Sequence, residues 1–109
     1  MKNDTVYLED ILNAIRHIEQ YTKKGKRSFM SHEVVQDAVI RQLAIIGEAV
    51  KHLPDSTRKQ QPDISWKRIA GMRDILVHDY SKTDVGKVWE TIRKDLPPLK
   101  KAVRVLMGA

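Results

Sequence analysis

Residues 31–54, with the sequence SHEVVQDAVIRQLAIIGEAVKHLP, decide the fold because their apolar residues recur every three or four positions. This spacing is typical of an amphipathic α-helix with one apolar face. Ser31 is suited to cap its first turn, and Pro54 to end it, since proline cannot continue a helix. Such a helix has to bury its apolar face against other helices. The face is formed by Val35, Ala38, Val39, Leu43, Ile46, Ala49, Val50 and Leu53.

Three other segments show the same helical period. They are residues 4–24 (DTVYLEDILNAIRHIEQYTKK), 66–80 (WKRIAGMRDILVHDY) and 85–107 (VGKVWETIRKDLPPLKKAVRVLM). The polar residues between Pro54 and Pro62 predict a connecting turn or one short helical turn. The apolar stripes of the three segments are Leu8, Ile11, Leu12, Ile15, Ile18 and Tyr21; Trp66, Ile69, Met72, Ile75 and Leu76; and Val85, Val88, Trp89, Ile92, Leu96, Leu99, Val103 and Leu106.

Residues with capping or breaking character mark the ends of these segments. Asp4 or Thr5 is suited to cap the first helix, and Gly25 to follow its end. Asp84 is suited to cap the last helix, because its carboxylate can accept hydrogen bonds from the first free backbone amides.

Pro97 and Pro98 lie inside the last segment, where they remove backbone donors and crowd the preceding turn, so this helix is expected to kink or restart there. No alternating strand pattern flanked by hairpin turns occurs in the sequence. Four helices joined by short loops predict an all-α, up-and-down four-helix bundle. The length of 109 residues suits one domain, residues 1–109.

The composition narrows the classes of function. The chain has no cysteine, which excludes disulfides, thiolate zinc sites and thiol nucleophiles. Its net charge of +6 and pI of about 9.7 favour a polyanionic partner such as nucleic acid. Neither a signal peptide nor a membrane span is visible, so a cytoplasmic protein is expected. A core this small also favours self-association.

Residues 71–80, GMRDILVHDY, bring Arg73, His78 and Tyr80 together near the end of the third segment. Positions five apart on a continuous helix are about 140° apart around its axis, so Arg73 and His78 would not share a face. Fraying of the last turn would swing His78 and Tyr80 round, and a two-fold axis would bring one chain's arginine to the other's histidine. Spacing alone favours a simpler interpretation: a solvated arginine, a histidine that complements the helix dipole and a tyrosine at the rim.

The stretch RDILVHDY matches the R-x-x-x-x-H-x-Y signature of HEPN-domain proteins of the HepT type, with Arg73, His78 and Tyr80 at the fixed positions. The resemblance extends over nearly the whole chain. Three blocks resemble those of the family in order and interval: residues 38–54 (AVIRQLAIIGEAVKHLP), 64–80 (ISWKRIAGMRDILVHDY) and 88–100 (VWETIRKDLPPLK).

The resemblance implies a metal-independent endoribonuclease that acts as the toxin of a type VII toxin–antitoxin pair in the prokaryotic cytoplasm. The implied active form is a homodimer with its motif residues in a cleft between subunits. Arg73 is then expected to bind phosphate, and His78 to accept or donate a proton. Two copies of His78 would supply both roles. Tyr80 is expected to receive AMP from an MntA-type minimal nucleotidyltransferase, the antitoxin, which adds bulk and negative charge to a basic cleft.

Three further residues are candidates for supporting roles. Asp74 follows the motif arginine, where many family members carry asparagine, and its carboxylate would offset part of the arginine's charge. Arg41 and Glu48 lie seven positions apart, hence on similar faces of the second helix, either near the cleft or as a solvated pair. Neither a metal nor a cofactor is expected, because paired metal-ligand spacing is absent from the remaining histidines, His17, His32 and His52.

Aromatic and basic side chains complete the set of expectations. Trp66 and Trp89 are expected in the core or in a dimer interface rather than as platforms for bases. Basic side chains in and around the third and fourth segments would bind phosphates without selecting a sequence. These residues are Lys67, Arg68, Lys82, Arg93, Lys94, Lys100, Lys101 and Arg104.

One alternative function belongs to a different class: a non-catalytic HEPN module that binds nucleic acid or the nucleotidyltransferase partner. The presence of both Arg73 and His78 favours the ribonuclease. The chain is not expected to be the nucleotidyltransferase itself, because it lacks a glycine-serine phosphate loop with paired aspartates.

Overall fold

The computed structural model describes the backbone of residues 2–78 and 84–108, and the side chains of residues 4–72 and 84–108. Within these ranges the chain forms six helices and no strand, as the all-α prediction requires. The helices are α1 (Lys2–Tyr21), α2 (Lys26–Met30), α3 (Glu33–Lys51), α4 (Asp55–Arg58), α5 (Trp66–His78) and α6 (Val85–Leu106).

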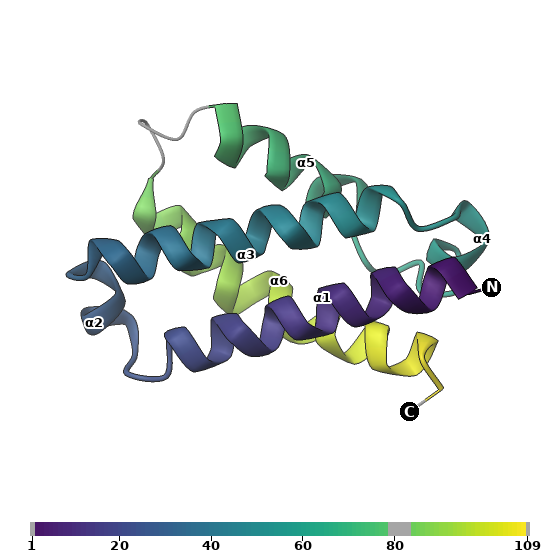
Figure 1. The fold of residues 1–109 in the computed structure, drawn as a ribbon, viewed down its shortest axis with the longest axis horizontal. Coiled ribbons are helices and arrows are strands. Elements are labelled where there is room, and N and C mark those ends of the chain that lie inside the picture. The colour runs from purple at the N-terminus through teal and green to yellow at the C-terminus, as the bar shows by residue number, and fades with distance from the viewer. Residues whose placement is uncertain (1, 79–83, 109) are drawn as a thin grey trace.

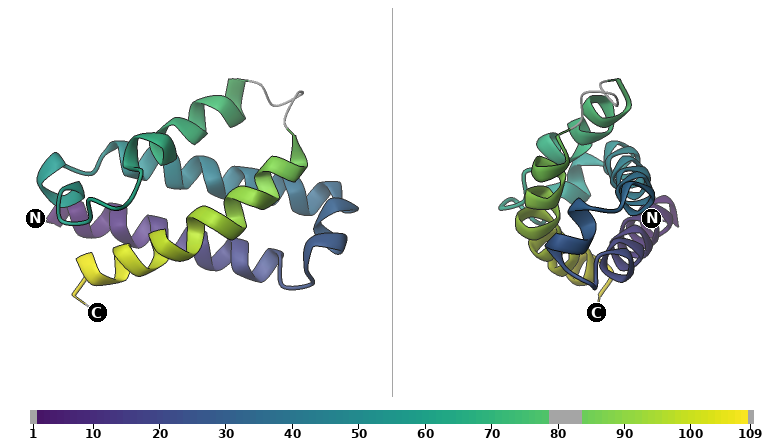
Figure 2. Two further views of the ribbon diagram at one scale, coloured as in Figure 1. Left: turned by 180° about the vertical axis from the view of Figure 1, so that it is seen from behind. Right: turned by 90° about the vertical axis from the view of Figure 1, so that its left-hand side faces the viewer.

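The four long helices α1, α3, α5 and α6 correspond to the four predicted segments and form an up-and-down bundle. Figure 1 shows α3 in the middle of the molecule, with α1 along one side and α5 along the other. α6 packs against α1, and the end-on view in Figure 2 shows the long helices arranged around a common interior. The C-terminal end of α5 and the N-terminal end of α6 lie at the end of the bundle away from the described termini.

The core is built on the apolar face of α3. Val39, Leu43, Ile46 and Val50 are almost completely buried, because α1 covers this helix on one side and α5 on the other. α1 contributes its own predicted stripe, from Leu8 to Ile18. Tyr21, the last residue of that predicted stripe, is instead 40% exposed, because it lies at the end of α1.

The helix α2 was not predicted. Its five residues are too few for a periodic signal, and so short a helix has little stability of its own. Phe29, which is 1% exposed, anchors it by packing on Trp89 with ring centroids 5.3 Å apart. Gly25 precedes α2 with a φ of 94°, a conformation that side chains rarely adopt.

Two predicted caps are wrong. α3 begins at Glu33, and the Ser31 hydroxyl instead donates to the carbonyl oxygens of Arg27 and Ser28 at the end of α2. α1 already begins at Lys2, so neither Asp4 nor Thr5 caps it. The Asp4 carboxylate accepts a hydrogen bond from the hydroxyl of Thr57, a residue buried to 6% exposure, and so ties α1 to α4.

The prolines of α6 do not interrupt it. The helix runs continuously from Val85 to Leu106 through Pro97 and Pro98, so the predicted restart does not occur, and the kink stays a prediction. Both proline rings are exposed, while Leu96 and Leu99 beside them are buried in the core. Packing on both sides of the pair holds the helix together although the two prolines cannot donate backbone hydrogen bonds.

Among the residues that the structure describes, none of the helices combines the length and apolarity needed to cross a bilayer.

A matched pair of valines on α3 tests the central position of this helix. Val39→Ala removes buried methyl groups and should lower the free energy of unfolding by about 2 kcal/mol. Val34 is 81% exposed, so Val34→Ala should change it by less than about 0.5 kcal/mol. Urea denaturation of both variants measures the difference. Equal losses would contradict the assigned core face.

Candidate functional site

Two of the three motif residues, Arg73 and His78, lie in the C-terminal half of α5. The structure places the backbones of Arg73, Asp74 and His78 within this helix, whose last residue is His78. Tyr80 lies outside the described residues, as does Lys82. The C-terminal half of α5 runs along α3 toward the end of the bundle that carries α2 (Figures 1 and 2).

The continuity of α5 decides how its motif positions relate to one another. Because the backbone is helical from Arg73 through His78, these two positions are about 140° apart around the helix axis. The fraying that would swing His78 round within one chain is therefore not found up to His78. The other predicted way to bring Arg73 and His78 together, a second copy of the chain related by a two-fold axis, stays a prediction.

α6 is fixed directly after residues 79–83 by the predicted cap. The Asp84 carboxylate oxygen Oδ1 accepts hydrogen bonds from the backbone N–H groups of Gly86, at 2.9 Å, and Lys87, at 3.3 Å. A Cβ at position 86 would lie 3.2 Å from the same oxygen, so glycine suits this turn. The cap prediction is confirmed, and it fixes the point at which the chain leaves the motif.

The two supporting candidates on α3 lie in different surroundings. Arg41 is exposed near the middle of the helix. The Oε1 atom of Glu48 lies 3.5 Å from Nε2 of His52. The His52 ring stacks on Tyr7 of α1 at a centroid distance of 5.0 Å. Glu48 thus belongs to a polar group that joins α3 to α1, an arrangement that the spacing of Arg41 and Glu48 did not suggest.

The histidines outside the motif have separate partners. The Nδ1 atom of His17 lies 3.4 Å from Oε1 of Gln42, and that of His32 lies 2.7 Å from the carbonyl oxygen of Ser28. No group of three or more potential metal ligands occurs among the described residues.

Several of the predicted phosphate-binding cations are paired. Arg68 pairs with Asp95, Lys100 with Glu19 at 2.9 Å, and Lys94 with Glu90 at 3.4 Å. The others with described side chains, Lys67, Arg93, Lys101 and Arg104, are exposed. Trp66 and Trp89 are each 7% exposed, which confirms that they are core residues.

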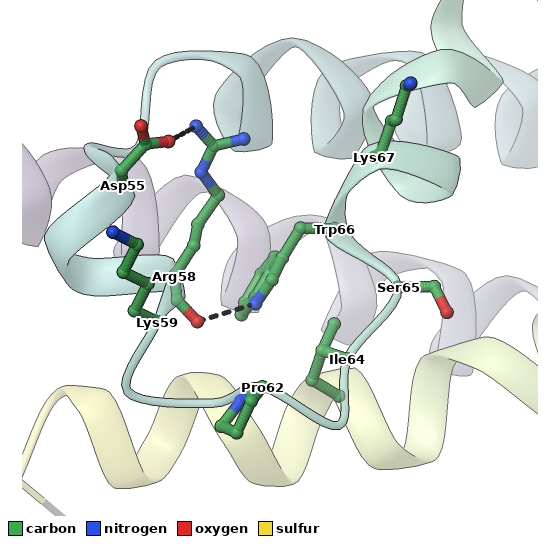
Figure 3. A pocket seen from close by; sticks show the side chains of 8 residues that line it. All are labelled: Asp55, Arg58, Lys59, Pro62, Ile64, Ser65, Trp66 and Lys67. Carbon is green, nitrogen blue, oxygen red and sulfur yellow. Dashed lines mark hydrogen bonds and ion pairs between the residues drawn. The ribbon is translucent and has the colours of Figure 1, made fainter.

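A hollow of about 450 Å³ lies where α4 leads into α5, and sequence reasoning did not find it. Figure 3 shows Trp66 at its centre, with Arg58 and Lys59 on one side and Lys67 on the other. The residues come from the polar stretch between Pro54 and Pro62 and from the first turn of α5. Positive side chains were predicted at this end of α5, but the concave shape was not.

Comparison with known proteins gives a consistent result. A family model described as "Ribonuclease HepT-like" matches residues 11–106. A Thermococcus cleftensis protein named "Probable ribonuclease HepT" is 44% identical over 95 residues, which cover 86% of each chain. A Caldanaerobacter subterraneus protein named "Putative RNase" is 41% identical over 98% of this chain and 96% of its own length.

A third relative is longer than this chain. It is a Methanocaldococcus jannaschii protein named "Gamma-glutamylcyclotransferase and putative RNase", 45% identical over 97% of this chain. The chain spans about half of it, 48% of its length. No solved structure is similar enough to count as a match.

Proposed function

The chain belongs to the HepT-like ribonuclease family, and we propose that it is a metal-independent endoribonuclease, the toxin of a type VII toxin–antitoxin pair. One observation carries the proposal: an arginine and a histidine at the motif spacing on one helix, within the segment that the family model matches. The net charge of +6 suits a polyanionic substrate.

The residue types suit cleavage by the RNA's own 2′-hydroxyl. This oxygen attacks the adjacent phosphorus while the bond to the 5′-oxygen breaks, which leaves a cyclic phosphate and a free 5′-hydroxyl. The reaction needs a base for the 2′-hydroxyl proton, an acid for the leaving oxygen and a cation for the phosphate. The imidazole of His78 can accept or donate a proton and so suits either proton role, and the guanidinium of Arg73 suits the phosphate.

A homodimer resolves two difficulties at once. One motif histidine per chain cannot serve as both acid and base in the same step, and Arg73 and His78 occupy different sides of α5. A two-fold axis beside α5 would set His78 of one copy against Arg73 of the other. The cleft between the subunits would then hold two histidines and two arginines. The active unit is accordingly the dimer.

The antitoxin in this proposal is an MntA-type nucleotidyltransferase that transfers AMP from ATP to the hydroxyl of Tyr80, with release of pyrophosphate. The added group brings a negative phosphate and considerable bulk beside His78. Both would oppose binding of an RNA phosphate in the same cleft. The modification would therefore switch off cleavage without unfolding the protein.

Loss of the motif side chains should remove cleavage. In metal-free buffer with chelator, His78→Ala and Arg73→Ala should each cut labelled RNA at least about 100-fold more slowly than the unmodified protein. His17→Ala, which alters an exposed histidine on α1, is the matched control and should retain full activity. Equal cleavage by His78→Ala and wild type would support the alternative, a non-catalytic HEPN module that only binds RNA or the antitoxin.

Modification should be confined to the motif tyrosine. Incubation with an MntA-type nucleotidyltransferase and ATP should add AMP to Tyr80, which intact mass and peptide mass spectrometry detect, and cleavage should fall in parallel. Tyr80→Phe should gain no such mass. Modification of Tyr7 or Tyr21 in place of Tyr80 would contradict the assignment.

A further inference from the structure

The hollow between α4 and α5 has a rigid apolar floor formed by Trp66, Pro62 and Ile64 (Figure 3). The indole N–H of Trp66 donates to the carbonyl oxygens of both Arg58 and Gln61, each at 3.0 Å. These bonds fasten the loop between the two helices to the start of α5. The buried Trp66 side chain therefore holds the loop backbone against the floor of the hollow.

The rim of the hollow carries an excess of positive charge. Its only carboxylate, Asp55, forms an ion pair with Arg58. Lys59 and Lys67 are exposed, and neither has an ion pair with any residue whose side chain the structure describes. Figure 3 shows them on opposite sides of Trp66. Two uncompensated ammonium groups around one concave surface suit an anion, and the N-terminal end of α5 adds a dipole of the same sign.

The hollow and the motif histidine lie along one line of α5. Lys67 and His78 are eleven positions apart, so they are displaced by about 20° around the axis and about 16 Å along it. Gly71 lies between them on the same line, and a Cβ there would have no neighbour within 4 Å. The helix backbone is therefore open to close approach at Gly71, about a third of the way from Lys67 to His78. Asp74 also lies on this line, and its carboxylate lowers the net positive charge there. The positive charge that binds an anion therefore has to come from the hollow.

From this arrangement we propose that the hollow binds a backbone phosphate of the RNA substrate, about 16 Å along α5 from the scissile bond. The proposal rests on the proposed function for the identity of the polynucleotide. Lys59 and Lys67 bind the phosphate oxygens, and the strand passes over Gly71 toward His78. This interaction adds affinity without reading a base, because every nucleotide presents the same phosphate.

Binding of RNA oligonucleotides of graded length tests this proposal. Fluorescence anisotropy on the His78→Ala protein keeps the RNA intact, and Lys59→Ala/Lys67→Ala removes the two ammonium groups. Oligonucleotides too short to span about 16 Å should bind both proteins equally. Longer ones should bind the double variant about tenfold more weakly. The slope of log affinity against log salt should fall by about 0.7 for each RNA phosphate that the double variant no longer neutralises.

A second double variant controls for net charge. Lys23→Ala/Lys24→Ala makes the same charge change on exposed residues of the connection between α1 and α2, across α3 from α5. It should leave the length dependence intact. Equal weakening by both double variants, or a loss that does not depend on RNA length, would overturn the proposal.

The Trp66 indole N–H signal in NMR spectra separates a strand phosphate from a free anion. Long RNA should shift this signal and short RNA should not. A shift with inorganic phosphate but not with long RNA would identify a site for free anions. A shift only with an acidic protein partner would identify a docking site for protein. Either result would overturn the proposal. The two proposals can fail separately. A wild-type protein that does not cleave RNA but still binds it in a length-dependent way would contradict the proposed catalysis and would support phosphate binding in the hollow.

Discussion

Burial of the α3 apolar face on two sides is the constraint from which the rest of the structure follows. Val39, Leu43, Ile46 and Val50 fill the space between α1 and α5, so neither outer helix can rotate without exposing them. A small domain has little stability to spare, and this interior supplies most of what it has. The same packing sets which way α5 runs and where its C-terminal half ends. The candidate site is therefore positioned by a helix that contributes none of its motif residues.

The continuity of α5 determines how the catalytic candidates are placed. A regular helix places the backbone positions of Arg73 and His78 about 140° apart around its axis, so the two positions lie on different sides of α5. Two such helices related by a two-fold axis would place the arginine of one chain beside the histidine of the other. In the proposed complex, the positions from Lys67 past Gly71 to His78 would lead the substrate along α5 toward such a cleft. The proposed dimer and the proposed substrate path therefore both depend on the register of one helix.

Sequence reasoning was most reliable where a local physical signal was strong. A 3.6-residue period over many turns identified the four long helices, and Asp84 before a helical stripe identified a cap. It failed where tertiary contacts decide the outcome. α2 is held in place because Phe29 packs into the core beside Trp89. Asp4 lies inside α1, where its carboxylate binds Thr57, a residue far away in sequence. Serine is a common residue at the start of a helix, but Ser31 instead follows the last residue of α2.

The same distinction holds for the site. Arg73 and His78 were singled out by the resemblance to the HepT family, because their spacing alone favoured a solvated arginine and a structural histidine, and their roles stay predictions. The hollow beside Trp66 was not found, because its wall combines a short helix, a loop and a helix start whose sequences look like an ordinary polar connection. The contact of Glu48 with His52, one turn further along α3 and stacked on Tyr7 of α1, was not predicted, while a supporting role of Arg41 and Glu48 stays a prediction.

Mixed dimers of wild-type and His78→Ala chains test the composite cleft most directly. The two chains are co-expressed in equal amounts, and native mass spectrometry verifies that mixed dimers form. If one cleft needs both copies of His78, one as base and one as acid, a mixed dimer is inactive, and random pairing leaves wild-type dimers as about a quarter of the total. Cleavage per chain should then fall to about a quarter of the wild-type rate. A fall to only about half would show that each chain acts on its own and would contradict the account.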